Sequence, residues 1–522
     1  MAHKEPSKGP YGPEDSSINT ERKLGLEPSA SAGQGVVEDE FGSFHRSFTP
    51  RQIHVISLGS NIGSGLFIGS GKALVNGGPG GLMLGYFIVC VGVWANLQTL
   101  TEMTIAYPTS GNYIDYAGRW VDPALAFGAG LAEWLGWTSV FASEATFFVV
   151  LLDYWVKGSV PTAAWLSIFL IICLIVFLLP NTYFAWLQYF GSLVKVFLFL
   201  FNIVISLAVI GGAGPTGSVK DGSTWTDLPA FKNGFGGFAS AALLGIWAIG
   251  DQIFIGVMGG EAECPRYSMV NASNVIPWRI GTFYLVSAAL VTVIVPSSDE
   301  RLLGGSGAAA SPFVIAVADS GIKGVPDIIN ACMIVGILAI ALESIYLPSR
   351  ILREMALQKL VPLSGKGTEI LNWFISITSA SYFCNWAIVA FTSLRFHAAI
   401  KAQGIPIFSE AYGWQSFMWP FAPATVLVIS AFLFVALFYS GSVPLGGGPF
   451  SAYTFFTNTL GLYIIVGGTI GYKILMRTKW QNPATADMVR GRRQLSEAEI
   501  MLLDKHYSRP LWRRIGTYVK PW

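Results

Sequence analysis

The chain has 522 residues, of which 52% are hydrophobic and 12% are charged, and its mean hydropathy is +0.52. An ordinary soluble protein is less apolar, so these values predict a polytopic membrane protein that lies in a lipid bilayer. The net charge of +2 and the lack of a basic stripe exclude a nucleic-acid-binding protein. The five cysteines have no CxxC spacing, so they suggest neither a disulfide framework nor a metal site.

The two ends of the chain are predicted to be hydrophilic tails. Residues 1–50 are polar and rich in Pro, Gly, Ser and acidic residues, and they have no apolar stretch of the secretory type, which predicts a disordered cytoplasmic tail. Residues 51–475 form the predicted transmembrane domain, and residues 476–522 form a second cytoplasmic tail. Both tails are candidate binding segments for regulatory proteins.

Hydropathy predicts eleven spans between the tails, at about 20 apolar residues per crossing. They lie near residues 53–74, 81–106, 124–152, 163–180, 186–211, 236–260, 280–297, 327–347, 370–394, 416–439 and 453–475. A short apolar piece between the seventh and eighth spans, Pro312 to Val317, predicts an external helix that lies on the surface. The predicted fold class is an all-α polytopic membrane protein.

Glycine interrupts the first span. The run Ile56 to Gly71 carries five glycines, the residue that most weakens a helix interior. Broken backbone persists at membrane depth only where protein or a water-filled cavity satisfies it. An unwound stretch from Asn61 to Gly65 would therefore aim a helix N-terminus at an anionic group such as a carboxylate. A glycine-rich face for close helix packing explains the same residues.

Five ionisable side chains stand out as embedded in the predicted spans, where charges are costly and mark functional sites by default. They are Glu133 and Glu144 in the third span, Lys195 in the fifth, Asp251 in the sixth and Glu343 in the eighth. The two third-span glutamates share a helix face and lie roughly 16 Å apart along it. A carboxylate in a low-dielectric site takes up and releases protons near neutral pH, which suggests proton coupling. Static buried ion pairs are the alternative.

The sixth span contains a second glycine-interrupted stretch. Gly245 and Gly250 flank Trp247 there, and further glycines follow before residue 261. Two broken spans placed five apart are what an inverted repeat of five helices each produces, with a binding site between them at the midplane. Trp247 would cover a bound side chain, although a membrane-helix Trp also serves for packing or as an interfacial anchor.

The Lys/Arg distribution predicts a cytoplasmic N-terminus and one missing crossing. Basic loops that carry Arg119, Arg266 and Arg350 alternate correctly, but the loop after the ninth span, which carries Arg395, is basic as well. A single span between two basic loops would place them on opposite sides of the membrane. The sequence therefore predicts that a crossing is missing between Leu363 and Ile370.

Four runs of residues resemble the fungal amino-acid permeases of the amino acid/polyamine/organocation superfamily. They are LGSNIGSGLFIGSG at Leu58 to Gly71, TEMTIAYPTSGNYIDYAGRW at Thr101 to Trp120, GEAECPRYS at Gly260 to Ser268 and RFHAAIKAQG at Arg395 to Gly404. The resemblance runs from about Arg51 to the C-terminal tail. It implies twelve helices in a five-plus-five inverted repeat of leucine-transporter type, a plasma-membrane location and uptake of amino acids driven by the proton gradient, without another cofactor.

The resemblance also assigns roles to particular residues. The implied substrate-binding residues are Ile62, Gly63, Ser64, Gly65, Trp247, Ala248, Ile249 and Gly250. The first four match the segment that binds the α-carboxylate, the last three match the segment that receives the α-amine, and Trp247 takes the place of the gating aromatic. Glu144 matches the acid of the third helix, and Lys195 matches a fifth-helix lysine that stands in for a sodium ion in proton-driven relatives. This pair is the implied proton-coupling element.

Three acidic residues depart from the family pattern and are candidate specificity residues. Asp251 stands near Ile253, where many such permeases have a glutamate. Glu343 belongs to a Leu-Glu pair that replaces Asn-Ser, and Glu133 takes a place usually held by a neutral residue. An acidic side chain that faces the substrate would favour a cationic amino acid, whereas an aromatic-lined pocket around Trp247 would favour neutral or larger ones.

Relatives also have a further helix between the eighth span and Asn372, where this chain has only Ser364 to Thr368. The family length and the charge distribution therefore agree that the ninth family helix is absent. The chain is then the product of an altered transcript or gene prediction, or a degenerate permease. A non-transporting amino-acid sensor is the alternative function, and an enzyme is excluded because no nucleophile-base pair, phosphate loop or metal cluster is present in the sequence.

Overall fold

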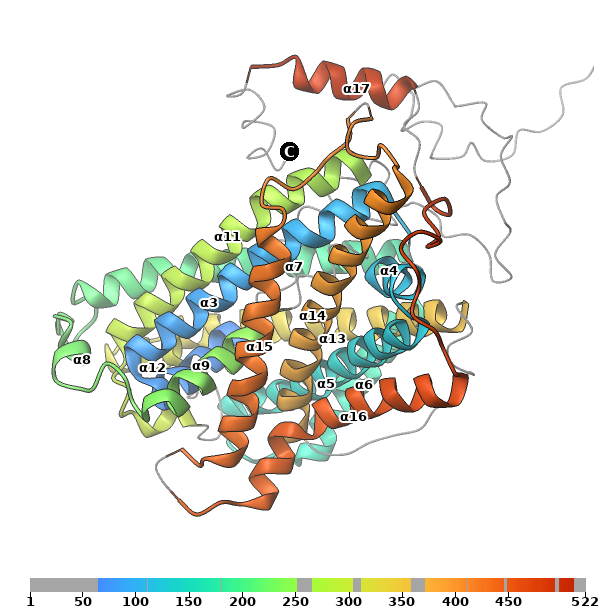
Figure 1. The fold of residues 1–522 in the computed structure, drawn as a ribbon. Helices are drawn as coiled ribbons and strands as arrows, with labels where there is room; N and C mark the ends of the chain where they lie inside the picture. Colours follow the sequence, from blue (N-terminus) through green and yellow to red (C-terminus); the bar gives the residue numbers. More distant parts are fainter. Residues whose placement is uncertain are drawn as a thin grey trace, which may run out of the picture. The chain divides into compact units, whose positions relative to one another are not determined.

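The computed structural model describes residues 64–109, 111–179, 181–250, 265–303, 311–357, 371–410, 412–445, 448–492 and 497–510. The chain divides into two compact units, Met1–Ser43 with Gln494–Val519 and Phe44–Arg493 with Lys520–Trp522. In the first unit the structure describes one helix, α17 (Glu497–Tyr507). The larger unit holds the other helices and is all-helical over its described residues (Figure 1).

The helices of the larger unit follow the predicted spans in order. They are η1 (Gly65–Gly69), α3 (Ser70–Ala106), α4 (Asn112–Trp120), α5 (Pro123–Val156), α6 (Thr162–Leu178), α7 (Asn181–Ile210), α8 (Ser223–Thr226), α9 (Gly234–Ile249), α11 (Pro265–Ile294), η3 (Glu300–Leu303), α12 (Pro312–Asp319), α13 (Val325–Leu357), α14 (Leu371–Gln403), α15 (Phe421–Ser442) and α16 (Ala452–Met476). Six stretches of the described residues are long and apolar enough to cross a membrane: Gly65–Ala106, Pro123–Val156, Trp186–Ile210, Val325–Ile345, Phe421–Ser442 and Ala452–Met476. The all-α class is confirmed for the described residues.

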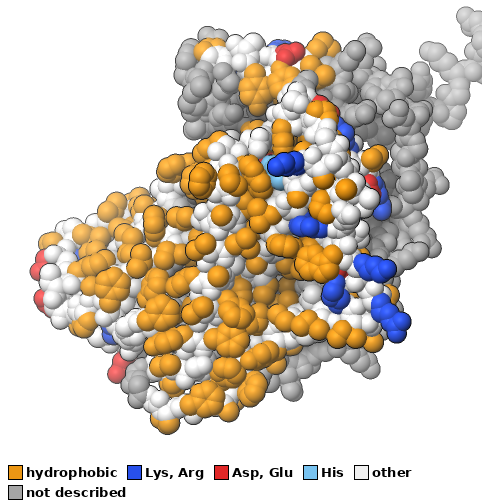
Figure 2. All heavy atoms as spheres, viewed as in Figure 1, with side chains coloured by type: hydrophobic (Ala, Val, Ile, Leu, Met, Phe, Trp, Pro, Cys, Tyr) orange, Lys and Arg blue, Asp and Glu red, His pale blue; other side chains and the backbone are white. Residues whose placement is uncertain are grey.

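The outer surface of the larger unit suits a lipid environment. Hydrophobic side chains cover most of the face shown in Figure 2, and Lys and Arg gather toward one end of it. Large apolar side chains such as Val428 of α15 and Ile474 of α16 are 68% and 69% exposed. So much exposed apolar surface is costly in water and is satisfied by lipid tails.

The first two predicted spans are joined by a bend. Gly78 has a φ of +73° inside α3 and precedes Pro79. A Cβ at Gly78 would lie 2.7 Å from the carbonyl oxygen of Ala230, so both the backbone angle and the space require glycine. The segment before α9 fixes the bend, because the N–H of Gly80 donates to Ala230 (2.7 Å) and the N–H of Lys232 donates to Gly77 (3.0 Å).

Helices α13 and α14 run in the same direction. Trp155, near the end of α5, donates to Asp327 near the start of α13 (2.9 Å between Nε1 and Oδ1). Arg395, in the last third of α14, donates to the carbonyl oxygen of Trp120 just before α5 (3.4 Å). Both helices are thus antiparallel to α5, which is the relative direction that the Lys/Arg distribution predicts.

The crossing predicted to be missing between Leu363 and Ile370 lies outside the described residues. The described chain ends at Leu357 of α13 and resumes at Leu371 of α14.

The prediction of a surface helix at Pro312 to Val317 needs correction. The apolar piece at Pro312 to Val317 does form a helix, α12, but all six residues are buried, and the centroid of the Phe313 ring lies 6.0 Å from that of Phe67 in η1. The prediction of a surface helix was wrong because these side chains fill space between helices.

The larger unit continues beyond residue 475, the predicted end of the transmembrane domain. The Tyr107 hydroxyl donates to the carbonyl oxygen of Met488 (2.8 Å), and both residues belong to this unit.

Candidate substrate and proton site

The two glycine-interrupted segments cross in direct contact. A Cβ at Gly65 would lie 2.6 Å from the Cα of Ala248, and a Cβ at Gly69 would lie 2.9 Å from the ring of Trp247. The close approach of η1 and α9 therefore requires glycine at both positions. Close helix packing therefore explains why Gly65 and Gly69 are glycines. The same contact brings Gly65 next to Ala248, so two parts of the predicted substrate site lie together. Ile62 and Gly63 lie outside the described residues.

Helix α9 ends inside the predicted break, at Ile249. Its final carbonyl groups are held by aromatic donors: Tyr284 of α11 donates to Ala248 (3.1 Å), and the indole of Trp386 of α14 donates to Gly250 (3.0 Å). Asp251 lies outside the described residues. The segment predicted to receive an α-amine is thus a helix C-terminus whose carbonyl groups are fixed by neighbouring helices.

Trp247 lies in the last turn of α9 and is 8% exposed. Its ring packs against Phe147 of α5, with the ring centroids 6.1 Å apart, and against Gly69. The predicted gating aromatic therefore bridges η1, α9 and α5. Sequence reasoning missed Tyr284 and Trp386, since nothing in a single sequence separates an aromatic donor from a packing residue.

Glu144 joins the first broken segment to a buried charge cluster. The hydroxyl of Ser64, directly before η1, donates to Oε1 of Glu144 at 2.5 Å. The charges of Glu144 on α5 and Glu343 on α13 both act on Lys195 of α7, and all three side chains are at most 2% exposed. We call Glu144, Lys195 and Glu343 the charge triad.

The charge triad has spare hydrogen-bonding capacity. Among the described residues, no group donates to Oε2 of Glu144 or to either carboxylate oxygen of Glu343, and the ammonium of Lys195 has no acceptor. The stem of Lys195 passes over Gly336 of α13, where a Cβ would lie 3.4 Å from its Cγ. A proton can therefore bind to either carboxylate without displacing an existing donor, apart from Ser64.

Glu133 has a different environment. Its Oε2 accepts hydrogen bonds from the hydroxyl of Tyr113 on α4 (2.8 Å) and from the amide of Asn385 on α14 (2.5 Å), and its Oε1 accepts one from the indole of Trp137 (3.1 Å). The side chain is 2% exposed. Neutral donors from α4, α5 and α14 thus engage the carboxylate.

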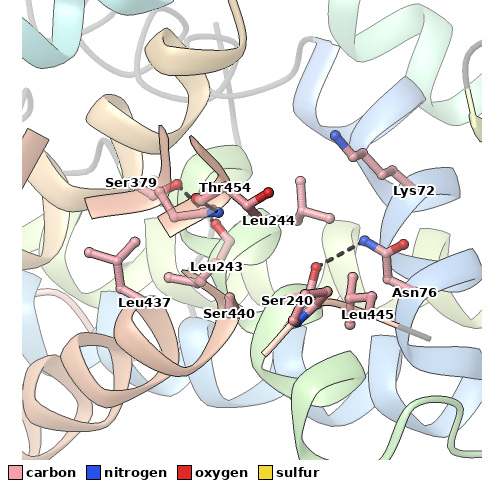
Figure 3. Close-up of a pocket in the computed structure, with 12 residues that line it drawn as sticks. Lys72, Asn76, Ser240, Leu243, Leu244, Ser379, Leu437, Ser440, Leu445 and Thr454 are labelled. Carbon is pink, nitrogen blue, oxygen red and sulfur yellow. Dashed lines mark hydrogen bonds between the residues drawn. The ribbon is translucent and has the colours of Figure 1, made fainter. Parts of the chain in front are cut away.

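A cavity of about 280 Å³ lies beside the crossing, between α3, α9 and the neighbouring α14, α15 and α16 (Figure 3). Lys72 and Asn76 of α3 and Ser240 of α9 line it, and the amide of Asn76 donates to Ser240 (2.9 Å). None of the predicted site residues lines it. Lys72 should have been a candidate, because it lies within the predicted first span and satisfies the same criterion as Glu144.

Broken helices that cross through glycine, charges buried between helices and an apolar outer surface together define a polytopic membrane protein with an internal polar site. The sequence model of the amino acid permease family matches residues 52–369 and 363–482. The chain therefore belongs to the amino acid permease family. The two matched stretches overlap at residues 363–369, between the end of α13 and the start of α14.

Curated relatives agree with this family. The chain is 27% identical over 518 residues to amino-acid permease GAP3 of Candida albicans, and the alignment covers 92% of this chain and 86% of the relative. It is 28% identical over 482 residues to S-adenosylmethionine permease GAP4 of the same organism, covering 86% and 79%. It is also 28% identical over 469 residues to cationic amino acid transporter 1 of Schizosaccharomyces pombe, covering 83% and 79%.

Among solved structures, the manganese transporter of Eremococcus coleocola matches 86% of this chain and 99% of its own chain, at 13% identity and a TM-score of 0.44. The nucleobase-cation symporter Mhp1 matches 79% and 96%, at 13% identity and a TM-score of 0.33.

Proposed function

We propose that the chain is a proton-coupled amino-acid permease of the plasma membrane, with both tails in the cytoplasm. The family match supports amino-acid transport. The hydrogen bond from Ser64 to Glu144 supports the coupling, because it joins the predicted carboxylate-binding segment to the charge triad. The proton gradient is the driving force, and no other cofactor or metal takes part.

The amino acid binds where η1 crosses the end of α9. Its carboxylate accepts from backbone N–H groups of the Ile62 to Gly65 segment, and its ammonium donates to carbonyl groups between Ala248 and Gly250. Trp247 covers the side chain. Rocking of two inverted repeats around this fixed site then exposes it alternately to the two sides.

A proton on Glu144 changes this site directly. The carboxylate accepts from Ser64, whereas a protonated carboxyl group offers a donor and attracts Lys195 less. Proton binding therefore weakens the hydrogen bond from Ser64 and the attraction between Glu144 and Lys195. The first effect acts directly on Ser64, the residue before η1, next to the bound carboxylate.

The acidic residues suggest which substrates to test. Glu133 is engaged by three donors, and Glu343 faces Lys195. Asp251 is then the remaining acidic candidate for contact with a cationic side chain. We propose that Asp251 decides between cationic and neutral amino acids.

A non-transporting amino-acid sensor is the second candidate function. The feature that favours it is the short stretch of sequence between α13 and α14, where the charge distribution and the family length predict that one crossing is missing. A sensor would bind the substrate in the same site and transmit its occupancy through the tails.

The test is uptake of a mixture of labelled amino acids by cells that lack their own permeases and express this chain. Uptake that rises at acidic pH and disappears in Glu144→Gln supports the permease. Glu410→Gln is the matched control, because Glu410 is a half-exposed carboxylate that pairs with Arg492. Binding without uptake, from protein that reaches the cell surface, would instead support the sensor.

A further inference from the structure

We propose that Glu133 and Asn385 form a second proton-binding site, distinct from the charge triad and linked to the substrate segment through Trp386. The inference rests on the proposed function, since it adds a proton site to a proton-coupled permease. It is carried by three observations: the set of donors around Glu133, an unused acceptor on Asn385, and the hydrogen bond of the next residue to α9.

The donors around Glu133 suit an ionised carboxylate. Tyr113, Trp137 and Asn385 each donate one hydrogen bond, at 2.8, 3.1 and 2.5 Å. An indole has no acceptor, so Trp137 can only donate. Three donors and no cation leave a net negative charge in the interior of the membrane, which is costly even when every oxygen is hydrogen-bonded.

Asn385 can also serve the protonated form. Its side chain is fully buried, and its Oδ1 accepts no hydrogen bond from the described residues while its Nδ2 donates to Glu133. Rotation of the amide by half a turn places Oδ1 where Nδ2 was, ready to accept from a protonated Glu133. Both protonation states of Glu133 thus have a matching partner, which a purely structural carboxylate does not need.

Charged groups on the packed elements are engaged elsewhere. Arg119 of α4 pairs with Asp115 at 2.8 Å, and Lys473 of α16 contacts Asp122 at the start of α5. On α13, the charge of Glu343 acts on Lys195. On α14, Arg395 donates to the carbonyl oxygen of Trp120, and His397 contacts the carboxylate of Glu102. Helix α6 has no charged side chain. Among the described residues, the groups whose hydrogen bonds to Glu133 are known are all neutral, so a proton on Glu133 changes the charge at this meeting point of α4, α5 and α14.

The link to the substrate segment consists of one peptide bond and one hydrogen bond. Trp386 follows Asn385 on α14, and its indole donates to the carbonyl oxygen of Gly250 at 3.0 Å. Tyr382, one turn earlier, would lie 2.9 Å from a Cβ at Gly250. A movement of Asn385 that accompanies protonation therefore acts on the helix end that is proposed to receive the substrate ammonium.

The test compares purified full-length protein in lipid vesicles as wild type, Glu133→Gln and Glu410→Gln. Entry of labelled amino acids and entry of protons, followed with a trapped pH-sensitive dye, give the number of protons per amino acid. We expect this ratio to fall by about one in Glu133→Gln, because an amide replaces the titrating group. Exchange of amino acids at equal pH on both sides should persist, and Glu410→Gln should match the wild type.

An unchanged ratio and pH profile in a folded Glu133→Gln protein would overturn the inference and leave Glu133 a structural residue. A wild type that neither exchanges nor accumulates amino acids would contradict the proposed function instead. In that event, pH-difference infrared spectra still test the inference. They should show a protonated carboxyl band in the wild type that is missing in Glu133→Gln and shifted in frequency in Asn385→Val, and a wild type without that band would contradict the inference.

Discussion

Helix α5 carries two buried glutamates, Glu133 and Glu144, whose carboxylates have different surroundings. Glu133 is surrounded by three neutral donors from α4, α5 and α14. Glu144, about three turns further along, has one hydroxyl donor and shares Lys195 with Glu343. The first carboxylate is engaged by neutral hydrogen-bond donors alone, whereas the second combines one hydrogen bond with the electrostatic influence of Lys195.

The difference predicts how each centre responds to change. Removing one of three neutral donors leaves the other two in place, so the cost is that of a single hydrogen bond. Removing the cation of a buried charge cluster leaves charge without compensation, which is far more costly. The charge triad is therefore the more sensitive of the two centres, and it is the one connected directly to η1.

The largest effect is expected for Lys195→Met. Two buried carboxylates lose their shared cation, at a cost of about 3 to 5 kcal/mol in stability, and uptake is abolished. Thermal unfolding in detergent and uptake in cells measure the two effects. Lys195→Met with Glu343→Gln should recover part of the stability, since it removes one of the uncompensated charges. A single variant as stable as the wild type would show that the triad is not charge-compensated.

Ser64→Ala should have the next largest effect. It removes the only described donor to Glu144, and a hydrogen bond to a charged group is worth about 1.5 to 3 kcal/mol, so the uptake rate should fall about tenfold or more. Ser70→Ala is the matched control, because the Ser70 hydroxyl donates within its own helix, to the carbonyl oxygen of Leu66 (2.6 Å). Equal losses in both variants would argue against a special role for Ser64.

Trp137→Phe tests the Glu133 centre and should cost about 1 kcal/mol of stability, because Tyr113 and Asn385 still donate to the carboxylate. Trp186→Phe is the control, with a side chain that is 51% exposed at the lipid-facing surface. Thermal unfolding in detergent measures both. A loss as large as that of Lys195→Met would remove the distinction between the two centres.

The smallest effect is expected at the start of α5, outside the membrane. Burial alone would raise the pKa of Asp122, but hydrogen bonds from Lys473, Thr478 and the N–H of Ala124 outweigh it and hold the pKa below its ordinary value. A lowered pKa in the folded state gives stability that is present above the unfolded-state pKa and lost as the pH falls through the folded-state value.

Asp122→Asn should accordingly lower the unfolding temperature by about 1 °C near neutral pH, and the difference from the wild type should vanish in acid. Unfolding temperatures of both proteins across the acidic range measure this. A difference that grows toward low pH would contradict the assignment.

Composition and local pattern predicted the all-α membrane class, because apolar length is a local property of the sequence. The direction of α14 relative to α13 also followed from the two basic stretches of sequence that carry Arg350 and Arg395. The burial of α12 did not follow, since six apolar residues in a polar loop do not reveal which helices cover them.

The candidate site was predicted in its charges but not in their partners. Glu133, Glu144, Lys195 and Glu343 stand out because ionisable residues are rare in spans. Their donors, such as Ser64 and Asn385, lie 80 and 252 residues away in sequence. Such pairings depend on how helices pack, and one sequence without its fold does not specify them.

The most direct test of the central claim is accumulation of labelled amino acids in vesicles that hold the purified chain, with an inwardly directed proton gradient. We predict accumulation above the outside concentration, collapse of that accumulation when a protonophore is added, and none in vesicles with Glu144→Gln. Saturable binding without accumulation in the wild type, or accumulation that Glu144→Gln leaves intact, would contradict coupling through the charge triad.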